Sequence, residues 1–193
     1  MAGPRVTLFG LGNPGDRYAA TRHNVGFMVL DELACRLRAR FRSGSGRAVA
    51  RGNWRAEKLV LVKPMLYMNE SGVPVAEHLR REPDDYLVVC DDFALPFGRL
   101  RLRARGSEGG HNGLASIIYR LGTDDFPRLR IGIGVPPREQ DWAEYVLAPF
   151  GPEETNELPE LVGRAADACL AVAAEGLNRA MNRYNPPLET STP

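Results

Sequence analysis

The sequence has few cysteines and no apolar run long enough to cross a membrane. Its three cysteines, Cys35, Cys90 and Cys169, are odd in number and form no CxxC pair, which excludes a disulfide framework. No apolar run approaches the ~20 residues of a membrane span. Residues 1–5 carry no charged-then-apolar leader. Together these absences predict a protein of the reducing cytoplasm.

A metal-ligand motif and an excess of positive charge are also missing. The three histidines and three cysteines never reach a spacing such as HxxxH or CxxC, so we expect no metal site. The net charge of +1 gives no bulk argument for a nucleic-acid partner. At 193 residues, 44% hydrophobic and 25% charged, the chain is long enough for one well-filled core.

Strand-like apolar runs interleave with helical patterns, and no repeat or linker separates them. The strands are expected at 6–9, 47–51, 57–62, 86–90, 99–104 and 128–134. The helices are expected at 24–40, from Ser71 as N-cap to before Pro83, at 114–121, 161–174 and 177–184, with a flexible turn at 43–46. This order predicts an α/β protein whose mostly parallel or mixed sheet is covered on both faces.

Polar side chains follow three of the predicted strands. Asn13 comes after the 6–9 run, Asn69 follows the run that ends at residue 62, and Asp91 directly follows Cys90. In open α/β sheets, ligands bind beyond the carboxyl ends of the strands, where loops converge. Three strand exits that each deliver a hydrogen-bonding group predict a built site at this edge.

His23 precedes the first predicted helix and has two interpretations. A lone histidine there most often caps the helix or is structural. If Asp91 accepts a hydrogen bond from it, the pair could instead activate water, because the carboxylate fixes the tautomer and stabilises the imidazolium. Cys90 should face the core, and His78, beside two arginines on a helix, should face solvent. Asn69 and Asn112 could be helix caps or amide ligands.

Residues 10–15 (GLGNPG) fit the dinucleotide-binding pattern G-x-G-x-x-G after a strand. That pattern requires the glycines to open directly into a helix that holds the pyrophosphate. Here residues 14–16 form a turn, and the next helix begins only near Asn24. A nucleotide-dependent oxidoreductase is therefore a distant alternative.

Four arginines alternate with apolar residues between positions 99 and 105. On a strand, Arg99, Arg101, Arg103 and Arg105 would share one face. Such a stripe is typical of an edge strand protected by charge. It is equally typical of a phosphate-binding surface, because guanidinium groups match phosphate oxygens.

Taken together, these motifs resemble the bacterial peptidyl-tRNA hydrolases over nearly the whole chain, from Leu8 to Asn185. Five segments carry the resemblance in the right order: 10–18, 21–26, 63–72, 109–114 and 128–134. The chain departs from the family pattern at Ala94, where an aspartate is usual, and at residues 65–66.

The resemblance implies a single α/β domain over 1–185 with a twisted mixed sheet, a flexible tail at 186–193 and a monomer without cofactor or metal. It implies cleavage of the ester that joins a peptide to the 3′ ribose of tRNA. His23 would be the general base, Asp91 its partner, and Asn112 would position water or stabilise the oxyanion. The residues that would bind the peptide are Asn13, Tyr18, Met68 and Asn69. Those that would bind tRNA phosphate are Arg101, Arg103 and Arg130. The alternative is a catalytically inactive RNA-binding relative involved in RNA processing.

Overall fold

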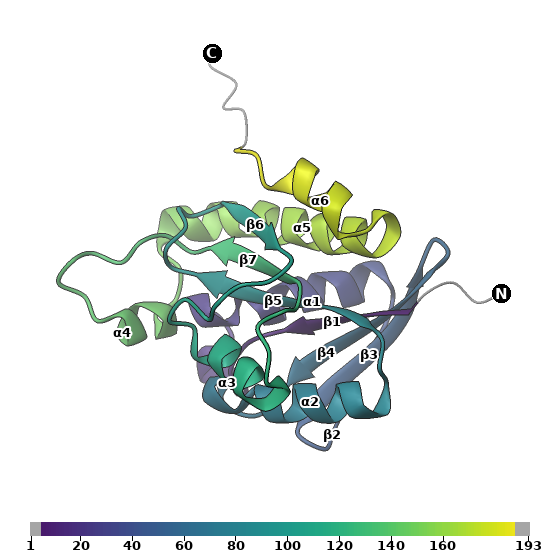
Figure 1. Cartoon of the computed structure of the whole chain (residues 1–193). Helices are drawn as coiled ribbons and strands as arrows, with labels where there is room; N and C mark the ends of the chain where they lie inside the picture. The colour runs from purple at the N-terminus through teal and green to yellow at the C-terminus, as the bar shows by residue number, and fades with distance from the viewer. Residues whose placement is uncertain (1–4, 188–193) are drawn as a thin grey trace, which may run out of the picture.

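The predicted apolar runs form the middle of one seven-stranded sheet (Figure 1). The computed structural model describes residues 5–187. The strand order is β2-β3-β4-β1-β5-β7-β6. The strands are β1 (Arg5–Gly10), β2 (Arg42–Gly44), β3 (Arg47–Trp54), β4 (Glu57–Pro64), β5 (Asp85–Asp92), β6 (Leu100–Arg103) and β7 (Arg128–Gly132). The four central strands β4, β1, β5 and β7 run parallel, and the outer strands pair antiparallel. The predicted mixed α/β sheet is therefore confirmed.

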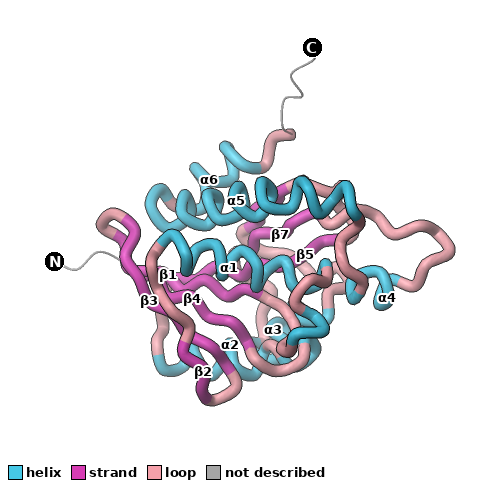
Figure 2. The backbone as a smooth tube through the Cα atoms, turned by 180° about the vertical axis from the view of Figure 1, so that it is seen from behind, coloured by secondary structure: helices cyan, strands magenta, loops and turns pink. Residues whose placement is uncertain are grey.

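Helices cover both faces of the sheet, as Figures 1 and 2 show from opposite sides. The α-helices are α1 (Val25–Arg36), α2 (Gly72–Arg81), α3 (Asn112–Leu121), α4 (Trp142–Leu147), α5 (Pro152–Glu175) and α6 (Leu177–Tyr184). Three short 3-10 turns are η1 (Asp16–Tyr18), η2 (Arg22–Asn24) and η3 (Met68–Glu70). None of the helices between residues 5 and 187 is both long and apolar enough to cross a membrane.

Side chains alternate between two buried layers, because successive strand residues point to opposite faces. On β1, Leu8 joins the layer under α1 and α5, whereas Phe9 joins the layer under α2 and α3. On β5, Val89 and Cys90 divide in the same way, so the expectation that Cys90 is a core residue is confirmed. Each fully buried aliphatic side chain contributes about 1.5–3 kcal/mol, and these layers fix the strand ends that carry the site.

Several predicted boundaries were wrong for local reasons. The first helix ends at Arg36 rather than 40, because Arg38 takes a positive φ of 51° that breaks the helical path. The segment at 43–46 is not a free turn: β2 pairs with β3, and Ser45 and Gly46 connect them with φ of 51° and 70°. Helix α5 begins at Pro152, well before its apolar pattern starts at Leu161. The predicted tail lies outside the described residues from position 188 onward.

Two of the three glycines in residues 10–15, Gly10 and Gly12, serve helix packing, whereas Gly15 has a positive φ of 103° and no neighbour within 4 Å of an added β-carbon. A β-carbon on Gly10 would lie 2.4 Å from the carbonyl oxygen of Gly26, and one on Gly26 would lie 2.5 Å from that of Leu11. Helix α1 therefore packs directly against the end of β1. Two 3-10 turns separate Gly15 from α1, so the glycines do not open into a helix N-terminus.

Candidate active site

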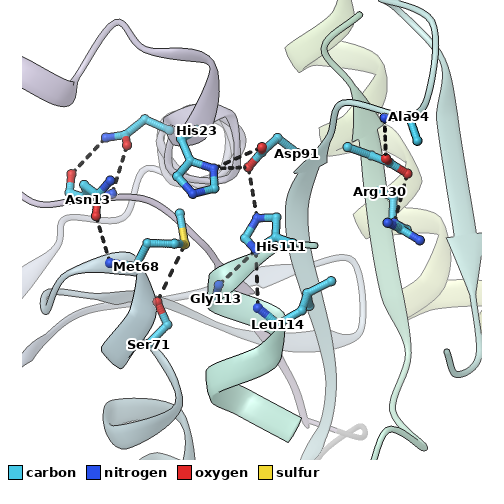
Figure 3. A network of polar contacts seen from close by, with 12 residues as sticks. Asn13, His23, Met68, Ser71, Asp91, Ala94, His111, Gly113, Leu114 and Arg130 are labelled. Carbon is cyan, nitrogen blue, oxygen red and sulfur yellow. Dashed lines mark hydrogen bonds and ion pairs between the residues drawn. The ribbon is translucent and has the colours of Figure 1, made fainter. Parts of the chain in front are cut away.

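A histidine and an aspartate meet beyond the carboxyl end of the sheet (Figure 3). Asp91 is the penultimate residue of β5, and His23 lies in η2, between β1 and α1. His23 Nδ1 is 2.9 Å from Asp91 Oδ1 and 3.0 Å from Oδ2, and both side chains are buried. This is the contact that the sequence suggested. With Nδ1 donating to the carboxylate, the other ring nitrogen, Nε2, is left as the site for a proton.

A second histidine, His111, holds the same carboxylate. Its Nε2 lies 3.0 Å from Asp91 Oδ1, and its Nδ1 accepts the backbone N–H groups of Gly113 and Leu114 at 3.0 and 3.3 Å. Because Nδ1 is an acceptor, the proton must be on Nε2, and His111 is neutral. This role was not predicted. The available signal was its position immediately before an apolar helix, where it is the N-cap of α3 in place of Asn112.

Asp91 is held as a carboxylate. Burial raises its pKa, but the charge of His23 and the hydrogen bonds from His23 and His111 outweigh burial, and the net pKa lies well below its usual range. An ionised carboxylate at the end of a buried strand can therefore both orient the His23 ring and balance a positive charge on it.

The contact between His23 and Asp91 shifts the pKa of His23 upward, whereas it shifts that of Asp91 downward. Burial lowers the pKa of His23, but attraction to Asp91 and their hydrogen bond outweigh it, so the pKa is raised above 6.5. In linkage terms, His23 stabilises the fold below pH 6.5, and that contribution is lost as pH rises through the folded-state pKa.

This direction predicts the pH dependence of catalysis. A general base must be neutral, so kcat/KM should fall on the acid side with a midpoint above 6.5. A pH–rate profile of the free enzyme measures that midpoint directly. Removal of the Asp91 charge should move it to lower pH, whereas a wild-type midpoint at or below 6.5 would contradict a carboxylate-supported His23.

His23, Asp91 and His111 place three metal-ligand types together, with one ligand atom of each within 4.8 Å of the others. The hydrogen bonds argue against a cation at this position. A metal on His111 Nε2 would move the proton of the neutral ring to Nδ1, and that nitrogen already accepts two backbone N–H groups. The arrangement is instead explained by two histidine N–H groups, from His23 and His111, that both donate to the Asp91 carboxylate.

A cavity of about 260 Å³ opens in front of this pair. Its walls come from η2, the loop after β5, the start of α3, and α4 with the residue before it. They are lined by His23, Asp91, Phe93, Gly110, His111, Asn112, Asp141, Trp142, Ala143 and Val146. Helix α4, which supplies one wall, was not predicted from the sequence.

The predicted substrate residues do not all reach this cavity. Asn112 lines it as the first residue of α3. Asn13 is buried beside it and lines a separate cavity; its Oδ1 accepts the backbone N–H of Met68 at 2.8 Å. Met68 is buried, whereas Asn69 is exposed on η3 and Tyr18 is half-buried on η1. Asn13, Met68, Asn69 and Tyr18 are not among the described residues that line the catalytic cavity.

The arginine stripe is only partly one surface. Arg101 and Arg103 are exposed on β6, an edge strand whose Leu100 and Leu102 are buried. Arg99 precedes the strand, and its Nη2 donates to the carbonyl of Asn185. On the neighbouring strand β7, Arg130 is the register partner of Arg101, and its Nε lies 2.9 Å from Asp92 Oδ2.

Arg128 of β7 is fully buried, unlike the other arginines of this surface. Its guanidinium donates to the carbonyls of Gly106, Ser107, Asp124 and Phe126. It thereby fixes the base of the glycine-rich loop that leads to His111.

The expectation that His78 faces solvent was wrong. The ring is 1% exposed and meets Phe9 edge-on at a centroid distance of 5.5 Å. Burial lowers its pKa, so it packs as a neutral ring. The prediction relied on the neighbouring arginines, but these lie on the outer face of α2, whereas His78 lies on the face that packs against the sheet.

Comparisons with known proteins show the family to which this chain belongs. A family model described as "Peptidyl-tRNA hydrolase" matches residues 7–192. A peptidyl-tRNA hydrolase of Chloroflexus aggregans is 52% identical over 184 residues, covering 93% of this chain and 98% of the relative. One of Mycobacterium tuberculosis is 49% identical over 190 residues, covering 96% and 99%. A crystal structure of peptidyl-tRNA hydrolase from Acinetobacter baumannii superimposes with a TM-score of 0.85 at 32% identity, covering 96% of both chains.

Proposed function

Because the chain belongs to the bacterial-type peptidyl-tRNA hydrolase family, we propose that it hydrolyses the ester bond between a peptide, or an N-blocked aminoacyl group, and the 3′ ribose of tRNA. The observation that carries this proposal is the buried His23–Asp91 pair, with Nδ1 to Oδ1 at 2.9 Å, at the wall of an open cavity. No cysteine or serine is among the described residues lining that cavity, so water is the natural nucleophile.

In the proposed mechanism His23 Nε2 takes a proton from water as the oxygen attacks the ester carbonyl. Asp91 stabilises the imidazolium that forms, and neutral His111 keeps the carboxylate in place. Asn112, at the cavity wall, donates an N–H to the developing oxyanion. Collapse of the tetrahedral intermediate returns the proton from His23 to the ribose oxygen, which leaves a peptide acid and a tRNA with a free 3′ hydroxyl.

Asn13, Met68, Asn69 and Tyr18 are proposed to hold the peptide. The Asn13 side chain uses Oδ1 on the Met68 backbone, which leaves its Nδ2 as a donor for a peptide carbonyl. Met68 offers an adaptable apolar contact behind the ester. Figure 3 shows Asn13 and Met68 on the side of His23 away from Arg130.

Arg101, Arg103 and Arg130 are proposed to bind tRNA phosphate. Two of these guanidinium groups are exposed on the edge strand, and the third lies on the adjacent strand. We also propose that the enzyme is a monomer that needs no cofactor or metal, as the family resemblance implies, and that it works in the cytoplasm, as its cysteine usage suggests.

The test is release of the acyl group from purified N-acetyl-aminoacyl-tRNA by the purified chain, with tRNA affinity measured in parallel. Turnover supports the hydrolase. Tight tRNA binding by the folded chain without turnover would favour an inactive RNA-binding relative.

A change at Arg103 tests the phosphate surface. Arg103→Ala should raise KM for full-length peptidyl-tRNA several-fold and flatten its salt dependence by about one unit of slope, because one phosphate contact is lost. A minimal substrate that lacks most of the tRNA should be nearly unaffected. Arg81→Ala, on the exposed end of α2, is the matched control. Equal losses on both substrates would make Arg103 structural.

A further inference from the structure

Helix α4, which walls the catalytic cavity, is tied to the turn that carries His23. The backbone N–H of Arg22 donates to the carbonyl of Ala148 at 3.1 Å, and its Nη1 donates to the carbonyl of Pro149 at 2.7 Å. The Arg22 guanidinium also lies 4.3 Å from the ring centroid of Tyr145. The position of α4 over the cavity is therefore fixed from its C-terminal end.

Trp142, the first residue of α4, presents an aromatic ring at this cavity. It shares a helix face with the buried Tyr145 and Val146, three and four residues later. Yet Trp142 is 59% exposed. Its ring meets Phe93 at a centroid distance of 4.8 Å and an interplanar angle of 43°. Phe93 supports the indole, and much of its surface remains open for a ligand in the same cavity as His23.

The aromatic pair lies on the side of the cavity where phosphate is expected. Two consecutive glycines lie between Phe93 and Arg130. A β-carbon on Gly110 would lie 3.3 Å from Phe93 Cζ, and one on Gly109 would lie 2.6 Å from Arg130 Nη2. Phe93 and Arg130 thus flank one short loop. In Figure 3, Arg130 and Asn13 lie on opposite sides of the His23–Asp91 pair.

The chemistry of the substrate places a nucleotide base close to the scissile ester. The scissile ester is attached to the 3′-terminal ribose, so the terminal base is separated from the ester by only that ribose. We propose that Trp142 stacks on the 3′-terminal base of the tRNA and thereby positions the ester in front of His23. This inference rests on the proposed function. Stacking on an aromatic ring tolerates any base, so Trp142 would fix orientation without reading sequence.

One other exposed aromatic residue is a competitor for this role. Tyr67 is 53% exposed and directly precedes Met68. It is not among the described residues lining the cavity, and Met68 lies on the Asn13 side. The geometry therefore favours Trp142 for the base.

The experiment combines a change in the protein with a change in the substrate. N-acetyl-aminoacyl-tRNA with a normal 3′ nucleotide is compared with one whose terminal ribose lacks its base. For the wild type, loss of the base should raise KM about 5- to 150-fold, the range that base–aromatic stacking spans. Trp142→Ala should raise KM for the normal substrate by a similar factor. For this variant, removal of the base should cause no further rise in KM. Trp142→Phe should keep most of the effect.

Tyr119→Ala, which removes an 83% exposed aromatic ring on α3, is the control and should retain the full base dependence. Losses from Trp142→Ala and from the abasic substrate that simply multiply would overturn the inference. So would loss of base dependence in Tyr67→Ala but not in Trp142→Ala. Absence of turnover by the wild type on either substrate would instead contradict the proposed function itself.

Discussion

Asp91→Asn should lower kcat by about 10³- to 10⁴-fold while the protein stays folded. An asparagine has one acceptor oxygen where the aspartate has two, and both are now within 3.0 Å of His23 Nδ1. The amide N–H₂ would face that nitrogen and favour the wrong tautomer. Even with the ring correctly oriented, no negative charge would remain to stabilise the imidazolium.

The matched control is Asp92→Asn. Asp92 is also buried on β5, but it pairs with Arg130 and does not contact His23. Its loss should act mainly on KM, with kcat reduced less than about tenfold. Steady-state kinetics on both variants, with thermal unfolding of each, makes the comparison. Equal losses of kcat would mean that Asp91 acts only through the packing of the strand end.

Arg128→Met should destabilise the fold by at least about 3 kcal/mol. The guanidinium of this buried arginine satisfies four backbone carbonyls, and an unpaired buried carbonyl costs about 1–3 kcal/mol. A methionine fills part of the volume but donates nothing, so the loop before His111 would lose its anchor.

Urea unfolding measures this cost, and Arg103→Met provides a matched control. Arg103 is the register partner of Arg128 on the adjacent strand, but it is exposed. Arg103→Met should change the free energy of unfolding by no more than about 0.5 kcal/mol. A similar small change for both variants would show that the four carbonyls find other partners.

Local patterns were sufficient to predict the sheet. The alternation of buried and exposed residues on β6 and the apolar runs of β1, β4 and β5 placed these strands, because the side-chain period is set within each segment. Boundaries failed where polar turns continue a helix, as at Pro152, or where a left-handed residue ends one, as at Arg38.

The site was predictable only in part. His23 and Asp91 could be paired because strand exits converge in this class of fold, although 68 residues separate them. The role of His111 depends on which way its ring turns at the start of α3, and no local pattern encodes that. The same holds for His78, whose burial is decided by the side of α2 that meets the sheet, and for Trp142, whose helix has too few residues for a periodic signal.

A single-turnover measurement on His23→Ala alongside the wild type tests whether His23 is the general base. Both proteins are saturated with N-acetyl-aminoacyl-tRNA, and their affinity for deacylated tRNA is measured separately. The proposed role of His23 predicts that the cleavage rate falls by at least about 10³-fold, because the general base is lost, while tRNA affinity changes little. Cleavage by His23→Ala at a rate near that of the wild type would contradict it, since another group would then have to activate the water.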